Sequence, residues 1–219
     1  MRLLITGSPG AGKGTQGTRL AAHFGIPHLS SGDLLRKIVA SGDGAVAQSA
    51  RAISDGKMVS DETANALMLG ELDKPEAANG FVLDGYPRTL SQAQTLTAFL
   101  AGRGEKLDAV VALEVSEVAV IERLGNRITC PQCGETYHAL VSPPKVVGVC
   151  DECGYAGLTV RPDDLPERIT VRLRLYTERT EPILGYYREQ NLLTPVNAEG
   201  TENDVFARIV AALKKVAPL

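Results

Sequence analysis

The feature that most constrains this chain is a glycine-rich segment that directly follows a short apolar run. Residues 7–15 read GSPGAGKGT and follow the apolar residues 3–6. Glycines let the backbone fold tightly around an anion, and successive N–H groups in such a loop point inward toward it. A helix expected over residues 15–24 would aim its positive end at the same anion. Together with the charge of Lys13, the segment predicts a phosphate-binding loop between a strand and a helix.

Apolar runs alternate with helical patterns along the rest of the chain. Continuous runs at 3–5, 81–83 and 110–113 are typical of strands buried on both faces, and 26–29 and 192–196 are weaker candidates. Helices are expected over residues 15–24, 61–72, 90–101, 116–126, 165–190 and 203–216. Asp61 and Ser116 are suitable N-caps, and Gly25 stands where a helix would end. The alternation predicts an α/β fold in three layers, a parallel sheet flanked by helices.

Two segments interrupt this alternation. Residues 30–59 are helical and punctuated by glycine, and residues 127–164 contain all the cysteines and many prolines and glycines. We expect a core domain of residues 1–29, 60–126 and 165–219, with 30–59 and 127–164 as inserted subdomains. Insertions at strand ends often cover a substrate.

The cysteines form two pairs with the spacing of a metal site. Cys130, Cys133, Cys150 and Cys153 read C-x2-C-x16-C-x2-C, which is within the range of a tetrathiolate zinc site. Four thiolates complete a tetrahedral shell and leave no open position, so the expected zinc is structural. Two disulfides or a redox pair are the alternatives. A zinc ribbon can also bind nucleic acid, but this segment is poor in lysine and aromatic residues.

Charge and hydropathy exclude several classes of partner. The formal net charge is −3, whereas duplex-binding proteins are usually basic, so we expect no nucleic-acid partner. No apolar stretch approaches the roughly 20 residues of a membrane span, and the N-terminus runs directly into the glycine-rich loop. We therefore expect a cytoplasmic protein with no membrane partner.

Arginine is unusually frequent for an acidic chain, with 15 arginines against eight lysines. The planar guanidinium matches phosphate oxygens bidentately. Six arginines stand at junctions between predicted segments: Arg36, Arg88, Arg123, Arg127, Arg161 and Arg172. As a set around a phosphate-binding loop, they indicate a phosphate clamp rather than isolated surface ion pairs. Asp84 ends a predicted strand, where the corresponding acid of P-loop enzymes engages Mg²⁺.

These motifs together resemble the adenylate kinase family, in its bacterial type with a zinc-bearing lid. The resemblance runs from Met1 to the C-terminal helix. It is carried by GSPGAGKGT at 7–15, SSGDLLR at 30–36, DGYPRT with Gln92 at 84–92, the four cysteines, and RPDD at 161–164. Gly14 stands where many phosphate-binding loops have Ser or Thr, and the GKGT ending is this family's own variant.

The resemblance implies reversible transfer between ATP plus AMP and two ADP, with Mg²⁺ and structural Zn²⁺ as cofactors, by a protein that we expect to be a monomer. The implied ATP contacts are Gly10, Ala11, Gly12, Lys13, Gly14, Thr15, Arg123, Arg127, Thr136, Tyr137 and Gly200. The implied AMP contacts are Ser31, Arg36, Lys57, Met58, Val59, Gly85, Tyr86, Pro87, Arg88, Gln92, Arg161 and Arg172, with Gln92 reading the adenine edge. The catalytic set comprises Lys13, Asp84, Arg88, Arg123, Arg127, Arg161 and Arg172, with Asp33 and Asp84 holding Mg²⁺ through water.

The chemistry of the residues agrees with this implication. A phosphate acceptor is already ionised at neutral pH, so the reaction needs no general base, and His23, His28 and His138 are interpreted as surface or packing residues. Catalysis then rests on positioning, on electrostatic stabilisation and on the exclusion of water. Two alternatives stay open: a relative that uses another base, such as a GTP:AMP or pyrimidine monophosphate kinase, and a P-loop switch whose zinc ribbon binds a partner.

Overall fold

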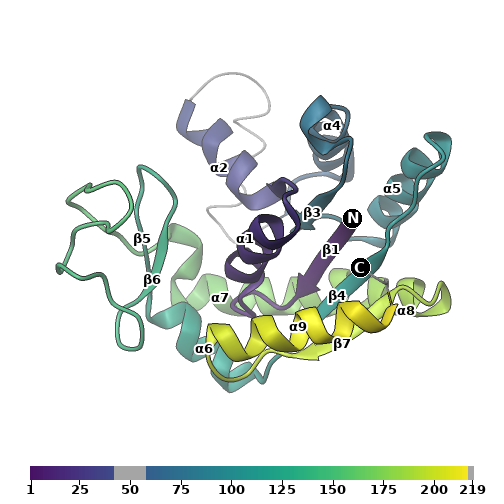
Figure 1. Cartoon of the computed structure of the whole chain (residues 1–219). Helices are drawn as coiled ribbons and strands as arrows, with labels where there is room; N and C mark the ends of the chain where they lie inside the picture. The colour runs from purple at the N-terminus through teal and green to yellow at the C-terminus, as the bar shows by residue number, and fades with distance from the viewer. Residues whose placement is uncertain (42–57, 217–219) are drawn as a thin grey trace.

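A five-stranded parallel sheet forms the centre of the molecule. The computed structural model describes residues 1–41 and 58–216 (Figure 1). The strands are β1 (Arg2–Gly7), β2 (His28–Ser30), β3 (Phe81–Asp84), β4 (Ala109–Glu114) and β7 (Leu193–Asn197), in the order β2-β3-β1-β4-β7. Every neighbouring pair is parallel. The predicted α/β fold is confirmed, and the two weaker strand candidates are the two edges of the sheet, where a strand has one paired neighbour.

Helices connect the strands and begin and end close to the predicted positions. They are α1 (Lys13–Phe24), α2 (Ser31–Ser41), α4 (Asp61–Leu72), α5 (Leu90–Gly102), α6 (Glu117–Gly125), α7 (Pro166–Leu175), α8 (Pro182–Glu189) and α9 (Glu202–Val216). The single helix expected over residues 165–190 is wrong: α7 and α8 are separated by a π-helical turn, Tyr176–Thr180.

The helix ends show which capping predictions were right. Gly25 ends α1 in the left-handed conformation, with φ of 64°, and the Ser116 hydroxyl accepts a hydrogen bond from the Ala119 N–H. The prediction that Asp61 caps its helix is wrong. Ser60 is the N-cap of α4, because its hydroxyl accepts from the Thr63 N–H, and Asp61 is the first helical residue. Its carboxylate is therefore free to make a different contact, described below.

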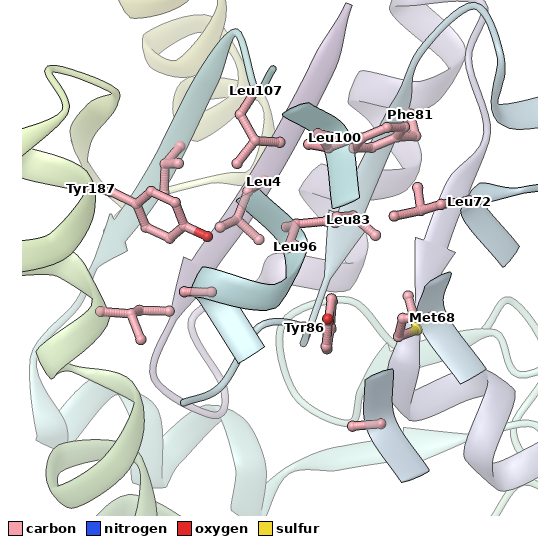
Figure 2. Packing of buried hydrophobic residues seen from close by; sticks show 14 of the residues in the cluster. Leu4, Met68, Leu72, Phe81, Leu83, Tyr86, Leu96, Leu100, Leu107 and Tyr187 are labelled. Atoms are coloured by element: carbon pink, nitrogen blue, oxygen red, sulfur yellow. The ribbon is translucent and has the colours of Figure 1, made fainter. Parts of the chain in front are cut away.

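Both faces of the sheet are buried under helices. Leu4 of β1 belongs to a cluster with residues of α4, α5 and α8, including Met68, Leu96 and Tyr187 (Figure 2). Its neighbours Leu3 and Ile5 belong to the opposite cluster, with residues of α1 and α9. Alternate side chains of one strand thus enter two separate cores, which explains the continuous apolar runs in the sequence.

The topology brings the polar motifs together at the carboxyl end of the sheet. The glycine-rich loop follows β1, α2 follows β2, and Asp84 ends β3. Because the strands are parallel, these segments leave the sheet at its carboxyl end, where α/β folds place their ligands. A second, two-stranded antiparallel sheet, β5 (Arg127–Thr129) and β6 (Thr136–His138), lies apart from the main sheet (Figure 1). No helix in the described part of the chain is long and apolar enough to cross a membrane.

Candidate active site

The glycine-rich loop wraps around the ammonium group of Lys13. Lys13 is the first residue of α1, two residues earlier than predicted. Its Nζ donates hydrogen bonds to the carbonyl oxygens of Gly7 and Ser8, both at 2.8 Å. Gly10 has φ of +80°, and a Cβ there would lie 2.9 Å from the Leu124 side chain, so the loop requires glycine at this position. The positive charge is thus held at the N-terminus of α1, as a phosphate site needs.

Burial lowers the pKa of Lys13 from its ordinary value of 10.5 to about 8. Asp84 opposes this shift, whereas Arg88, Arg172 and Arg127 add to it through charge repulsion. The protonated form of Lys13 is therefore destabilised in the protein without a ligand. A bound polyphosphate would relieve that cost, because an opposite charge nearby favours the protonated form.

The lowered pKa of Lys13 predicts how stability depends on pH. Between pH 8 and 10.5 Lys13 is more often protonated in the unfolded chain than in the folded chain, so its contribution to the free energy of unfolding rises with pH across this window. Lys13→Met lacks the group. Its unfolding free energy relative to the wild type should be highest below pH 8 and fall toward pH 10.5. Urea unfolding without nucleotide measures this difference, and a difference that does not change with pH would contradict the lowered pKa.

Asp84 lies beside the loop at the end of β3. The Asp84 side chain is 10% exposed, and a Cβ built on Gly14 would lie 3.8 Å from its Oδ2. The ring of His28 approaches the same oxygen, with Nε2 at 3.6 Å, and packs so closely on Gly17 that a Cβ there would lie 2.5 Å away. His28 is therefore a packing residue, as predicted, but one that packs beside an acidic group of the site.

A second pocket opens between α2, α4 and the segment after β3. Among its lining residues are these predicted ones: Ser31, Arg36, Met58, Val59, Gly85, Arg88, Gln92 and Arg172. The Ser31 hydroxyl and Arg88 Nε both donate to the carbonyl oxygen of Gly85 at 2.6 Å. Lys57 lies outside the described residues. The structure does not bring the Tyr86 side chain to this pocket, because it lies in the hydrophobic core and its hydroxyl donates to Asn65.

Arg88 is held at three places. Besides the bond from Nε, its backbone N–H donates to Gln92 Oε1 at 2.7 Å, and its carbonyl oxygen accepts from the Thr180 hydroxyl at 3.0 Å. Burial lowers the pKa of Arg88, and the nearby Arg172 lowers it further. The guanidinium thus has a fixed position before any ligand arrives, next to other positive charges.

Asp163 and Asp164 hold two further arginines, Arg127 and Arg172, in place. Asp164, whose side chain is fully buried, accepts from Arg127 Nε at 2.7 Å and from Arg172 Nη1 at 2.6 Å. Asp163 lies 3.0 Å from Arg172 Nη1. Burial alone would raise the pKa of Asp163, but Arg172 and Arg127 hold it below its usual value. The RPDD motif therefore supplies the carboxylates that keep these cations together.

Arg161 and Arg123 complete the arginine set. Arg161 Nε donates to the Thr129 hydroxyl at 3.0 Å, and burial, with Arg127 nearby, lowers the pKa of Arg161 to about 10. Arg123 Nη2 donates to the carbonyl oxygen of Ala198 at 2.9 Å, close to Gly200. Each guanidinium thus donates to an acceptor within the described part of the chain.

A cleft of about 1120 Å³ joins these groups. Its lining includes the predicted residues Gly10, Ala11, Gly12, Lys13, Gly14, Thr15, Asp33, Arg36, Met58, Asp84, Gly85, Pro87, Arg88, Arg123, Arg127, Thr136, Tyr137, Arg161, Arg172 and Gly200. The cleft and the smaller pocket share Gly32, Arg36, Met58, Gly85, Arg88 and Arg172. Three arginines of the set therefore stand where the two spaces meet.

The cysteines gather into one cluster on two tight turns. The four Sγ atoms lie within 4.8 Å of one another, with Cys133 and Cys150 at 3.5 Å and Cys130 and Cys153 at 3.6 Å. Gly134 and Gly154 have φ of 85° and 73° and donate to the carbonyl oxygens of Cys130 and Cys150. Sulfur atoms bound at about 2.3 Å to one tetrahedral Zn²⁺ would lie at similar separations, so the donor set fits this metal.

Tyr137 has a contact that the sequence did not reveal. Its hydroxyl lies 3.4 Å from Cys150 Sγ and accepts a hydrogen bond from the Asp151 N–H at 2.8 Å. The hydrogen bond from this hydroxyl to the sulfur is the main cause that lowers the pKa of Cys150 to about 6, and the backbone N–H groups of Glu152 and Cys153 add to it. The side chain predicted to contact ATP therefore also touches the cysteine-bearing turns.

Other residues of the site escaped the sequence analysis. Thr180 follows no recognisable motif, and its contact with Arg88 depends on the π-helical turn. Asp61 showed only the acidic signal of a helix start, yet its Oδ1 accepts from Gln92 Nε2 at 2.8 Å. The RPDD motif is visible in the sequence, but the pairing of its Asp164 with Arg127 and Arg172 joins positions 37 and eight residues apart.

A parallel sheet with a lysine-bearing phosphate loop and a second arginine-lined pocket is the architecture of a P-loop kinase. The family model described as "Adenylate kinase" matches residues 5–192. The chain is 43% identical over 217 residues to an adenylate kinase of Rhizobium rhizogenes, covering 99% of this chain and 100% of the relative. It is 42% identical over 213 residues to one of Moorella thermoacetica, covering 97% and 98%. The relative from Kosmotoga olearia is 39% identical over 213 residues, covering 95% and 99%.

The chain belongs to the adenylate kinase family. It is accordingly a phosphotransferase that acts on ATP and AMP, as the resemblance implied.

Proposed function

We propose that ATP places its phosphates in the glycine-rich loop while AMP occupies the smaller pocket, and that the γ-phosphoryl group passes directly between them. The observation that carries this proposal is the meeting of the two spaces at Arg36, Arg88 and Arg172. An acceptor phosphate oxygen attacks the γ-phosphorus, and the bond to the β,γ-bridging oxygen breaks. The former AMP and the former ATP both leave as ADP.

The proposed ATP contacts follow the cleft. They are Gly10, Ala11, Gly12, Lys13, Gly14, Thr15, Arg123, Arg127, Thr136, Tyr137 and Gly200. The proposed AMP contacts are Ser31, Arg36, Lys57, Met58, Val59, Gly85, Tyr86, Pro87, Arg88, Gln92, Arg161 and Arg172. For Tyr86 only the backbone is available, because its side chain is buried in the core.

In this proposal, catalysis comes from positively charged side chains that are already positioned around the transferring phosphoryl group. Charge develops on the equatorial oxygens of the transferred group and on the leaving oxygen. Lys13, Arg88, Arg123, Arg127, Arg161 and Arg172 would stabilise it, and most of these already have fixed positions, so little reorganisation is needed during the reaction. No proton has to be removed from an ionised phosphate acceptor, which is consistent with the packing role of His28.

Two aspartates of the site are suited to hold Mg²⁺ through water. Asp84 lies buried beside Gly14. Asp33, about half exposed, pairs with Arg36 at 2.6 Å. Carboxylates are the protein ligands that Mg²⁺ prefers, and it usually keeps several waters. When bound with ATP, the ion would neutralise phosphate charge.

We further propose that residues 30–59 and 127–164 act as covers over acceptor and donor, with residues 1–29, 60–126 and 165–219 as the core. Water must be kept from the γ-phosphate, or ATP would be hydrolysed. Residues 127–164 contribute Arg127, Thr136, Tyr137 and Arg161 to the cleft, and 30–59 contribute Ser31 and Arg36 to the pocket. Because one chain supplies both pockets, the proposed active species is a monomer.

A nucleotide-pair assay tests the assignment. ADP formation is measured with ATP plus AMP, GTP plus AMP, and ATP plus CMP or UMP, at equal concentrations. ATP with AMP is expected to be the best pair, and another best pair would replace the assignment with a related kinase. Equilibrium titration should also show two nucleotide sites that one dinucleotide with a bridging polyphosphate blocks together. A single site would favour the P-loop switch.

We propose that the cysteine cluster holds a structural Zn²⁺, which compensates for the small core of residues 127–164. Cys130→Ala is expected to lower the unfolding temperature by roughly 10 °C, equivalent to about 3 kcal/mol in a chain of this size, while activity at 25 °C falls much less. Calorimetry with zinc analysis of the same sample measures both. Wild type stripped of zinc serves as the matched sample, and an unchanged melting profile after stripping would refute the structural role.

A further inference from the structure

Gln92, which lines the smaller pocket, has the orientation of its amide set by two neighbours. One of them can only donate a hydrogen bond, and the other accepts one. Arg88 N–H, which can only donate, lies 2.7 Å from Gln92 Oε1. The Asp61 carboxylate, which accepts when ionised, lies 2.8 Å from Gln92 Nε2 through its Oδ1. Reversing the amide would set a donor against a donor and an acceptor against an acceptor. Its two ends are therefore not interchangeable.

Asp61 is itself held in place. Its second oxygen, Oδ2, accepts from the Thr89 hydroxyl at 2.8 Å. Thr89 caps α5 by accepting from the Gln92 N–H. The carboxylate at the start of α4 is thereby fixed to the start of α5, and Gln92 itself is 3% exposed. A buried amide held at both ends has little freedom to flip.

These bonds leave Gln92 one hydrogen on Nε2 and one lone pair on Oε1. Adenine presents an amino donor at N6 beside a ring-nitrogen acceptor, which matches an amide in this orientation. Guanine presents a carbonyl oxygen at the same ring position, and so does hypoxanthine. That oxygen would face Gln92 Oε1, and because both atoms are acceptors, no hydrogen bond could form between them.

We propose that Asp61 is the positioning residue that makes the acceptor pocket select adenine over 6-oxopurine nucleotides, by fixing the Gln92 amide together with the Arg88 N–H. The inference rests on the proposed placement of AMP in this pocket. Asp61 acts through Gln92, so its removal changes the choice of base rather than the transfer of the phosphoryl group.

The test compares AMP with inosine monophosphate as acceptor, with ATP as donor and with ADP and inosine diphosphate separated by chromatography. Asp61→Ala is expected to lower the AMP-to-IMP ratio of kcat/KM about tenfold, as expected for one hydrogen-bonded base contact, mainly through the KM for AMP. Asp61→Asn should keep most of the preference, because its side-chain oxygen can still accept from Nε2. Glu62→Ala, an exposed neighbour in the same helical turn, is the matched control and should leave the ratio unchanged.

The outcomes separate this inference from the proposed function. If Asp61→Ala melts at a lower temperature but keeps the wild-type ratio while Gln92→Leu loses it, Asp61 only joins two helices and the inference is overturned. If Gln92→Leu also keeps the ratio, the base is read elsewhere and the inference is again wrong. If the wild type does not use AMP, the proposed function itself fails. Asp61→Ser, whose hydroxyl is one bond too short, replaces the alanine variant should that variant not fold.

Discussion

Replacing Arg88 with alanine is expected to slow phosphoryl transfer by roughly 10³-fold, the lower end of the range for an arginine that stabilises transferring phosphate. The reason is the position of Arg88, which lines both the cleft and the smaller pocket. Its guanidinium is held by the Gly85 carbonyl oxygen at 2.6 Å, so it needs no rearrangement to meet the reacting group. Steady-state assays with ATP and AMP measure the loss.

A control variant and a binding measurement show whether the loss of activity in Arg88→Ala is specific to phosphoryl transfer. Arg188→Ala removes the same charge from an exposed position in the last turn of α8 and should keep wild-type activity. The Kd of ATP for Arg88→Ala, measured without AMP, should change far less than kcat. A variant that keeps more than a tenth of the wild-type turnover would show that Arg88 does not contact the transferring group.

Replacing Lys13 with methionine is expected to lower kcat by roughly 10²- to 10³-fold, the usual loss for one preorganised charged donor. The methionine keeps an unbranched apolar stem, so the loss reports mainly on the ammonium. In the free protein that ammonium bonds to the carbonyl oxygens of Gly7 and Ser8, the strand end and loop start that ATP phosphates would face. Initial rates at saturating ATP and AMP measure the loss.

The Lys13 prediction has a matched control in Lys214→Met. Lys214 is exposed in the last turn of α9, and its replacement should leave kcat unchanged. Circular dichroism should show native helix content in both variants. Turnover of Lys13→Met within tenfold of the wild type would mean that the phosphates do not reach the ammonium.

Most of the fold could be predicted because its strands obey a simple rule. β1, β3 and β4 are buried on both faces and therefore appear as continuous apolar runs. The break between α7 and α8 does have a signal in the sequence, because Pro182 lies inside the expected helix and a proline there ends or kinks a helix. Pro182 has no N–H to donate, and the Glu181 N–H instead bonds to the Tyr176 carbonyl oxygen at 2.8 Å, which sets the wider turn.

The site was predictable where a motif is local and not where a contact joins distant segments. The glycine-rich loop and the cysteine pairs carry their geometry within a few residues. Asp61 and Gln92 are 31 positions apart, and an acidic residue at a helix start has an ordinary explanation in the helix dipole. Tyr137 likewise meets Cys150 only because a strand and a cysteine-bearing turn fold onto each other.

Asp164 has a consequence for how quickly nucleotides can leave. Arg127 and Arg172 already share its buried carboxylate, so an arriving phosphate competes with an internal anion instead of meeting unpaired cations. In the proposed placement of the nucleotides, the net gain in binding free energy would be smaller than the number of arginines suggests, and dissociation would be correspondingly faster. Strong binding of substrate and transition state alike would not raise kcat. In this proposal, an internal carboxylate lets the chain concentrate positive charge on the reaction while still releasing its products.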